Sequence, residues 1–323
     1  MPLWDLPLEQ LEQYAPDVGE PDDFDAFWSR TLEETRSHPL GVELTSVDSG
    51  LTAVRSWDVS FAGFGGHRIR AWLHLPASVE AGQRLPGVVQ FQGYGGGRGL
   101  AHENVLWALA GYAHLVMDTR GQGSGWSAGD TPDPVGSDPA QPGFMTRGIR
   151  DPSEHFYRRV FADAARAVET LRTQASVDAG RVAVVGGSQG GGISLAVAAL
   201  VPDVRAVMAD VPFLCHIARG TAITDRDPYA EVTRYLGIHR DSRELVLRTL
   251  SYFDGVSFAR RAGAPALFSV ALMDMICPPS TVYAAYNGYA GPKEIAVYHD
   301  NDHEGGGAVQ QARQLRWLRD QLL

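Results

Sequence analysis

A short stretch near the middle of the chain constrains the fold more than any other. Four apolar residues, Val182 to Val185, precede Gly186-Gly-Ser-Gln-Gly190, and the apolar, alanine-rich segment 193–200 follows. This pattern predicts a buried strand, a sharp turn with Ser188 at its tip, and a helix. Such a turn crowds the serine against the residues two positions away on each side, so only glycine fits there. The arrangement is typical of an exposed serine nucleophile.

The rest of the chain alternates between strand-like and helix-like segments. The predicted strands are 86–91, 113–118, 182–185, 204–209, 266–271 and 294–298, and the predicted helices are 104–110, 156–173, 193–200, 281–289 and 308–323. This alternation requires a mostly parallel, doubly wound sheet. Two earlier alternating segments, 52–60 and 69–75, are joined by Gly63-Phe-Gly-Gly66 and predict an antiparallel edge. Together with the serine turn, these features predict an α/β-hydrolase fold.

We expect a single domain over residues 1–323 with two helical additions. Residues 1–40 are acidic and aromatic, and their helical spacing predicts an N-terminal arm packed on the main domain or on a neighbouring subunit. Residues 212–262 show helical segments and no strand, which predicts a cap at the ligand-binding end of the sheet. Residues 125–153 are rich in Gly, Pro and Asp and predict a long surface loop.

Composition narrows the class of function. The 323 residues are 44% hydrophobic, enough for a large core. The formal net charge of -10 argues against nucleic acid or an anionic membrane as partner. No apolar run reaches the length of a membrane span, and the acidic N-terminus does not resemble a signal peptide. Cys215 and Cys277 are too few for a disulfide framework, so we expect a cytoplasmic protein.

The order of three residues predicts a catalytic triad. A serine hydroxyl becomes a good nucleophile when a base takes its proton, and an acid must orient that base. In α/β-hydrolases the chain order is serine, then acid, then histidine. Here Ser188 is followed by Asp274, just past strand 266–271, and by His303, after strand 294–298. Both follow the carboxyl ends of strands, where this fold assembles its site.

Other residues could fill the same roles. Asp210 also follows a strand, but we expect it to have a structural role beneath the site. His299, at the end of the last strand, is expected to be a buried or partly exposed structural histidine. The acidic turn from His299 to Glu304 offers no fixed ligand spacing, so no metal is expected. The glycine-rich loops do not match G-x-G-x-x-G, so no cofactor is expected.

Backbone N–H groups must stabilise the negative charge that develops on the substrate oxygen. We expect one from Gln189, at the positive end of the helix after Ser188. The other is expected from Tyr94, in the glycine-rich loop 93–97, where backbone can approach a substrate closely. We expect Cys277 to serve in packing.

One arginine is also expected to support the site. Arg120 begins the sequence Arg-Gly-Gln122 at the end of a strand. We expect its side chain to be paired, bracing a loop through Glu304 or another carboxylate.

Three motifs together resemble one known family. Arg120-Gly-Gln122, Gly186-Gly-Ser-Gln-Gly-Gly191 and His303-Glu304 are similar to the RGQ, GxSQGG and HE signatures of the acetyl xylan esterase and cephalosporin C deacetylase family, carbohydrate esterase family seven. The segments that begin at Asp210 and Asp274 also resemble the corresponding family segments. The resemblance therefore covers essentially the whole chain.

This resemblance implies removal of acetyl groups from small acetylated sugars, xylo-oligosaccharides and cephalosporin C through an acetyl-enzyme. It implies the roles already given to Ser188, Asp274 and His303, and to the N–H groups of Tyr94 and Gln189. It also implies a homohexamer, a trimer of dimers whose sites face an internal cavity.

The chain departs from the pattern at two places that bear on substrate preference. Gln92 stands where hydrolases often have histidine, and residues 124–143 form a long Gly- and Pro-rich segment. Alternatives are another hydrolase on this fold (a peptidase, a long-chain lipase or a broad short-chain esterase) and a non-catalytic binding protein.

Overall fold

The computed structural model describes residues 4–135 and 139–323, so the tip of the predicted arm (1–3) and part of the predicted loop (136–138) lie outside the described residues. The described strands form one nine-stranded sheet in the order β1-β2-β3-β5-β4-β6-β7-β8-β9. Their bounds are β1 Glu43–Val47, β2 Val54–Ala62, β3 Arg68–Pro76, β4 Leu85–Phe91, β5 Ala113–Met117, β6 Val177–Gly187, β7 Ala206–Asp210, β8 Ala266–Ala271 and β9 Lys293–Tyr298. In this order the neighbours from β1 to β5 pair antiparallel. The neighbours from β5 through β4 and β6 to β9 pair parallel. The predicted fold class is confirmed.

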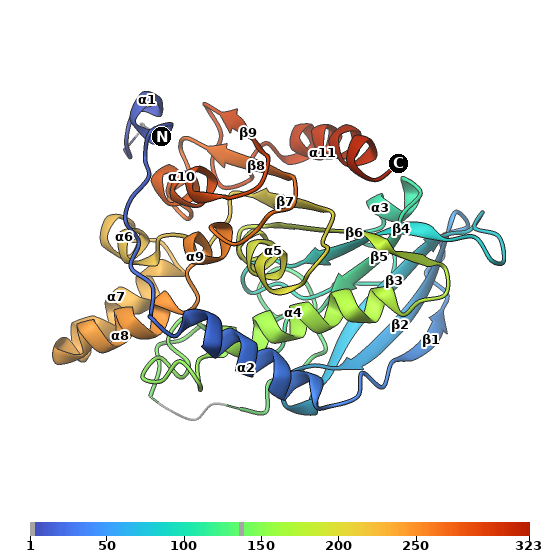
Figure 1. Ribbon diagram of the computed structural model, residues 1–323, viewed down its shortest axis with the longest axis horizontal. Coiled ribbons are helices and arrows are strands. Elements are labelled where there is room, and N and C mark those ends of the chain that lie inside the picture. Colours follow the sequence, from blue (N-terminus) through green and yellow to red (C-terminus); the bar gives the residue numbers. More distant parts are fainter. Residues whose placement is uncertain (1–3, 136–138) are drawn as a thin grey trace.

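Helices cover both faces of this sheet (Figure 1). Their bounds are α1 Leu8–Leu11, α2 Phe24–Arg36, α3 Leu106–Leu109, α4 Phe156–Arg172, α5 Gln189–Leu200, α6 Ile217–Ile223, α7 Tyr229–Ile238, α8 Arg243–Ser251, α9 Gly255–Ala259, α10 Pro279–Gly288 and α11 Gly307–Leu322, with short 3-10 turns at Phe64–Gly66 and Arg240–Ser242. No helix of the described chain is both long and apolar enough to cross a membrane.

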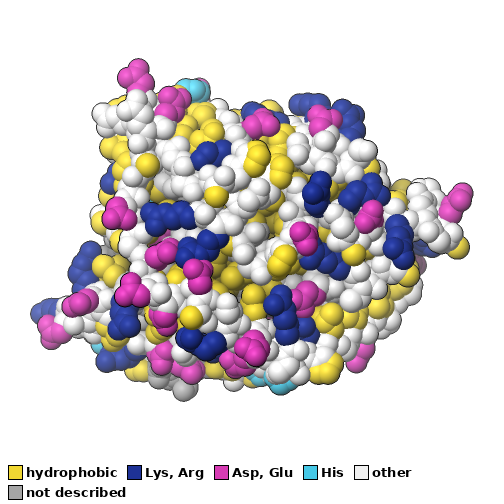
Figure 2. Space-filling view, viewed as in Figure 1, with side chains coloured by type: hydrophobic (Ala, Val, Ile, Leu, Met, Phe, Trp, Pro, Cys, Tyr) yellow, Lys and Arg dark blue, Asp and Glu magenta, His cyan; other side chains and the backbone are white. Residues whose placement is uncertain are grey.

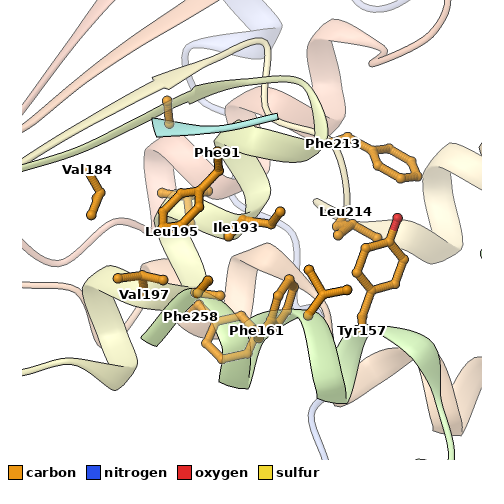
Figure 3. Packing of buried hydrophobic residues seen from close by; sticks show 14 of the residues in the cluster. Phe91, Tyr157, Phe161, Val184, Ile193, Leu195, Val197, Phe213, Leu214 and Phe258 are labelled. Atoms are coloured by element: carbon orange, nitrogen blue, oxygen red, sulfur yellow. The ribbon is translucent and has the colours of Figure 1, made fainter. Parts of the chain in front are cut away.

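Alternating side chains of the central strands divide the core in two. Val89 and Val184 face the larger cluster, which includes residues of α4 and α5, as the close view in Figure 3 shows for Val184 and its neighbours. Their neighbours Val88 and Ala183 face a smaller cluster with α3 and α11. Because successive strand side chains point to opposite faces, nearly continuous apolar strands are needed to bury both.

The N-terminal arm packs on its own domain. Trp28 is 2% exposed and donates a hydrogen bond from Nε1 to the carbonyl oxygen of Tyr252 at 3.0 Å. Its ring also lies 5.4 Å from that of Phe258, centroid to centroid. The helical spacing found in residues 24–36 thus produces an apolar face that completes the core beside α4 and α9.

Two features differ from the sequence prediction. Strand β1 was not predicted, because its side chains are mostly exposed and show no apolar alternation. The loop 125–153 has no helix or strand among its described residues, but Met145 and Ile149 are fully buried. The prediction of a surface loop is therefore wrong for this part. Figure 2 shows one face of the molecule, on which acidic and basic side chains are interspersed.

Candidate active site

Ser188 lies at the tip of a sharp turn between β6 and α5. Its φ of 55° is unusual for a residue with a side chain. The surrounding backbone holds it there, because its N–H donates to the carbonyl oxygen of Asp210 at 2.9 Å and its own carbonyl accepts from the N–H of Phe213 at 2.9 Å. Strained backbone fixed in this way is characteristic of functional sites.

Two glycines make the turn sterically possible. A Cβ on Gly186 would lie 2.4 Å from the carbonyl carbon of Gly190, and a Cβ on Gly190 would lie 2.3 Å from the carbonyl oxygen of Phe91. Gly187 differs, because the nearest atom to its Cβ would be 4.0 Å away. The first and last glycines of the motif are therefore required, and the middle one is not.

We expect Gly186→Ala to destabilise the protein by about 3 kcal/mol or more, because the added methyl overlaps backbone that cannot move aside. Gly187→Ala is the matched control and should change the free energy of unfolding by less than about 1 kcal/mol. Urea unfolding of both variants measures the difference. Equal stability of the two would show that the turn tolerates a side chain at position 186.

His303 and Asp274 form a directed pair. The two side chains are joined by a hydrogen bond of 2.8 Å between Nδ1 of His303 and Oδ2 of Asp274. Asp274 is fully buried, and its other oxygen accepts from the N–H groups of Ile276 and Cys277, each at 2.8 Å. The carboxylate is thus held by its own loop and orients the imidazole of His303 through Nδ1. The other ring nitrogen, Nε2, takes no part in this bond.

The same cavity is lined by Ser188 and His303. Its volume is about 780 Å³, and its wall includes Tyr94 and two residues of the helical insertion, Asp227 and Pro228. The predicted serine and histidine, which are far apart in the sequence, therefore lie at one cavity. Pockets of this size take small organic molecules.

A buried thiol stands beside the serine. The Sγ of Cys277 lies 4.0 Å from the Oγ of Ser188, and burial holds the pKa of this thiol well above its ordinary value. Asp274, Cys277 and His303 are also the described residues whose ligand atoms lie close enough together, within 4.8 Å, to hold a metal ion. From the sequence we expected Cys277 to serve in packing, and no pattern indicated that its thiol lies near Ser188.

The glycine-rich loop 93–97 is tied to the serine turn by glutamines. Gln122 accepts from the N–H of Gly95 at 2.8 Å, and its amide donates to Oε1 of Gln189 at 2.8 Å. The side-chain amide of Gln189 donates to the carbonyl oxygen of Gln92 at 3.2 Å. The hydroxyl of Tyr157 donates to Oε1 of Gln189 at 2.9 Å. These buried bonds set the distance between the two backbone segments from which the N–H donors were predicted.

The backbone N–H groups of Tyr94 and Gln189 have no hydrogen-bond partner within residues 4–135 and 139–323. For Gln189 this follows from its place at the first position of α5, where N–H groups have no partner inside the helix. Neither N–H group therefore has an acceptor among the described residues, and Tyr94 lines the cavity.

The side chain of Tyr94 has a role that sequence reasoning missed. Its hydroxyl donates to Oε1 of Glu231 and accepts from the N–H of Phe144, and Glu231 also accepts from the N–H of Met145 at 3.0 Å. Burial raises the pKa of both Tyr94 and Glu231. These bonds join the loop 93–97 to the helical insertion and to the buried part of the loop 125–153.

Arg120 is paired as predicted, although not with Glu304. It is fully buried and donates from Nε and Nη2 to both oxygens of Asp163, at 2.6 and 2.8 Å. A weaker contact of 3.4 Å reaches Asp133. Burial raises the pKa of Asp163, and the guanidinium opposes that rise. Arg120 thus braces the strand end before Gln122 against α4.

Glu304 instead orders the loop that carries His303. It accepts from the side-chain amide of Asn301 and from the N–H of Asp302. Of the two options given for Arg120, Glu304 or another carboxylate, the structure therefore shows the second, because the guanidinium points toward Asp163 on α4. His299, expected to be buried or partly exposed, is exposed in the turn after β9.

Asp210 is bound to α11 and not to His303. Its two oxygens accept from the amides of Gln310 and Gln314, at 2.8 and 2.6 Å. Burial raises the pKa of Asp210 to about 6. These contacts favour the predicted structural role beneath the site, which stays a prediction, and they do not support the alternative of Asp210 as the acid.

Comparison with known proteins agrees with this geometry. The acetyl xylan esterase (AXE1) family model matches residues 1–321. The chain is 28% identical over 314 residues to the acetyl esterase Axe7A of Xylanibacter ruminicola, which covers 96% of this chain and 70% of that protein.

Solved structures give the same result. An acetyl xylan esterase from Paenibacillus sp. R4 is 38% identical, with a TM-score of 0.93 over 98% of this chain and 100% of that one. Acetyl xylan esterase 1 from Thermoanaerobacterium sp. JW/SL YS485 is 35% identical, with a TM-score of 0.89 over 98% and 99%. An acylaminoacyl peptidase of Pyrococcus horikoshii, 17% identical with a TM-score of 0.59 over 84% and 41%, shares the fold alone. The serine turn, the oriented histidine and these matches along the whole chain place the protein in the acetyl xylan esterase family.

Proposed function

We propose that the protein is a serine esterase that removes acetyl groups from acetylated xylo-oligosaccharides and other small sugars. The observation that carries this proposal is the 2.8 Å bond from His303 to a buried Asp274, with His303 lining the cavity into which Ser188 opens. This is the arrangement by which a histidine is oriented to take a serine proton. Family membership supports an acetyl ester as the substrate.

In the proposed reaction Ser188 attacks the acetyl carbonyl carbon while His303 takes the hydroxyl proton. The carbonyl oxygen becomes negative and is stabilised by the N–H groups of Tyr94 and Gln189. His303 then gives the proton to the leaving alcohol, which departs and leaves an acetyl-enzyme. Water repeats the same steps on the acetyl-enzyme, releasing acetate and restoring Ser188. Asp274 keeps the histidine in the required tautomer throughout.

The acyl-length dependence tests this proposal. With p-nitrophenyl esters, kcat/KM should fall by at least about tenfold from acetate to butyrate, and further for octanoate, because each misplaced methylene has a large penalty in a fitted pocket. Equal activity on long-chain esters would favour a lipase. Activity on N-acylated peptides in place of esters would favour a peptidase.

Three finer properties belong to the same proposal. We extend the substrates to cephalosporin C, whose acetyl ester is also small and exposed, and deacetylation of that compound followed by chromatography tests this. We place the protein in the cytoplasm, which is supported by two buried free cysteines and no disulfide. We also propose that residues 212–262 form a cap, since Asp227 and Pro228 line the cavity.

The assembly is proposed to be a homohexamer, a trimer of dimers. The exposed apolar side chains Leu100, Leu109 and Val309, on and near α3 and α11, are consistent with a contact between copies. Light scattering coupled to size-exclusion chromatography measures the mass, and a monomer at micromolar concentration would contradict the proposal.

A further inference from the structure

One part of the cavity is unusually rich in side-chain amides. Beyond Ser188 it extends between α3 and α11, where Gln90, Asn104, Trp107 and Gln314 form its wall. The part near the helical insertion has three apolar residues, Val211, Pro228 and Ile276, and one carboxylate, Asp227. The apolar residues suit a methyl group, and the amide-lined part suits a group with several polar atoms.

Most of the cavity amides are already satisfied by the protein. Gln90 donates to Oδ1 of Asn104 at 3.1 Å and its oxygen contacts Nε2 of His114 at 3.0 Å. Gln310 and Gln314 donate to Asp210. These amides hold the wall of the cavity in place, and their donors are not free to bind a ligand.

Among the buried amides of the cavity wall, Gln92 is the exception. Its side chain is only 3% exposed, and its Nε2 has no hydrogen-bond partner among the described residues. It lies two residues after Gln90 and just past the end of β4, so strand alternation places it on the same face as Gln90, toward α3 and α11. A buried donor without a partner is rare in folded proteins and calls for an explanation.

The backbone of Gln92 is fixed next to the reacting centre. Its carbonyl oxygen accepts from the amide of Gln189 at 3.2 Å, and its sequence neighbours are the residues that lead to Tyr94. Gln92 therefore stands in the cavity wall directly before the loop 93–97, with its unpaired donor just beneath the surface of that wall. A turn of the amide about its last side-chain bond would present the donor to a ligand oxygen in the polar part of the cavity.

We propose that the amide of Gln92 binds the sugar part of the substrate by donating a hydrogen bond to a hydroxyl or ring oxygen. This inference rests on the proposed esterase function. The acetyl group has a single carbonyl oxygen, for which the Tyr94 and Gln189 N–H groups are available, and its methyl accepts nothing. The sugar has several acceptors, so it fits the amide-lined part, and the methyl fits beside Val211, Pro228 and Ile276.

The test compares two acetate esters that differ in the alcohol. An acetylated methyl xyloside offers acceptors to Gln92, whereas phenyl acetate offers none beyond the ester itself. For Gln92→Met, which keeps the length of the side chain but cannot donate, we expect the ratio of kcat/KM for the xyloside to kcat/KM for phenyl acetate to fall by about tenfold. Gln92→Leu gives a second, independent variant for the same measurement.

The control is Gln13→Met, which removes an exposed amide that does not line the cavity. This amide is already open to water, so the ratio should stay as in the wild type. The melting temperature of Gln92→Met should not fall, because no protein partner of Nε2 is lost. A merely structural Gln92 would lower the melting temperature and leave the ratio unchanged.

The outcomes separate the two proposals. If the wild type hydrolyses the xyloside acetate and Gln92→Met keeps the wild-type ratio, the role of Gln92 is overturned and the esterase function stands. If the wild type hydrolyses phenyl acetate but no acetylated sugar, the sugar-directed function itself fails, and the role of Gln92 fails with it.

Discussion

Ser188→Ala is expected to lower kcat for p-nitrophenyl acetate by a factor of about 10³ to 10⁶, the range found when a triad serine is removed. The reason is geometric as well as chemical. The positive φ of residue 188 aims its side chain from the turn into the cavity, and alanine presents a methyl group there. Binding and the backbone N–H groups would remain, so a small residual activity is expected.

The neighbouring thiol provides the control for this experiment. Cys277 lies 4.0 Å from Ser188 and is the one other nucleophile that the described residues place at this point. Its raised pKa keeps it as a thiol, and we therefore expect Cys277→Ser to retain activity within about tenfold. A serine-directed phosphonate should label the wild type and Cys277→Ser, but not Ser188→Ala. Full activity of Ser188→Ala would overturn the assignment of the nucleophile.

Local sequence rules account for the parts of the fold that depend on neighbouring residues. The strand, turn and helix around Ser188 were predictable, because the two glycines and the apolar flanks are determined within about ten residues of the serine. The positions of Asp274 and His303 were predictable from chain order, since each follows the carboxyl end of a strand in a parallel sheet. Helices with a clear apolar face, such as α2 and α4, were found for the same reason.

The partners of the buried polar residues were not predictable. Arg120 is 43 positions from Asp163, and any of several carboxylates was an equally good candidate from sequence. The bond from Tyr94 to Glu231 spans 137 positions and depends on how the helical insertion folds back. Strand β1 was missed because an exposed edge strand needs no apolar pattern. These features depend on tertiary packing, which the local periodicity of the sequence does not indicate.

Asp274→Asn is expected to lower kcat by about 10⁴-fold while leaving the fold intact. Asparagine can still accept from the N–H groups of Ile276 and Cys277, so its loop should keep its shape. The amide that replaces Oδ2 would then donate toward Nδ1 of His303, and this favours the tautomer with its proton on Nε2. In that form the histidine cannot take a proton from Ser188. Steady-state turnover of p-nitrophenyl acetate measures the loss.

Asp210→Asn is the matched control, because it makes the same chemical change at the end of the preceding strand. Its side chain contacts Gln310 and Gln314, and Gln314 can turn its amide oxygen toward the new amide. We expect its kcat to stay within about tenfold of the wild type. A larger loss for Asp210→Asn than for Asp274→Asn would assign the acid to Asp210 after all.

Stability against pH gives the control a second readout that does not involve catalysis. The folded pKa of Asp210, about 6, lies above the unfolded value, so the folded state holds this proton more tightly than the unfolded chain. The stabilising contribution is therefore complete below about pH 4 and is lost as the pH rises through about 6. Asp210→Asn has no such proton and should lack this part of the decline. The kcat of Asp210→Asn reports on the reaction, whereas the dependence of its unfolding free energy on pH reports on the buried carboxyl group. If Asp210→Asn keeps its turnover and loses the decline in stability near pH 6, Asp210 belongs to the scaffold and Asp274 remains the acid.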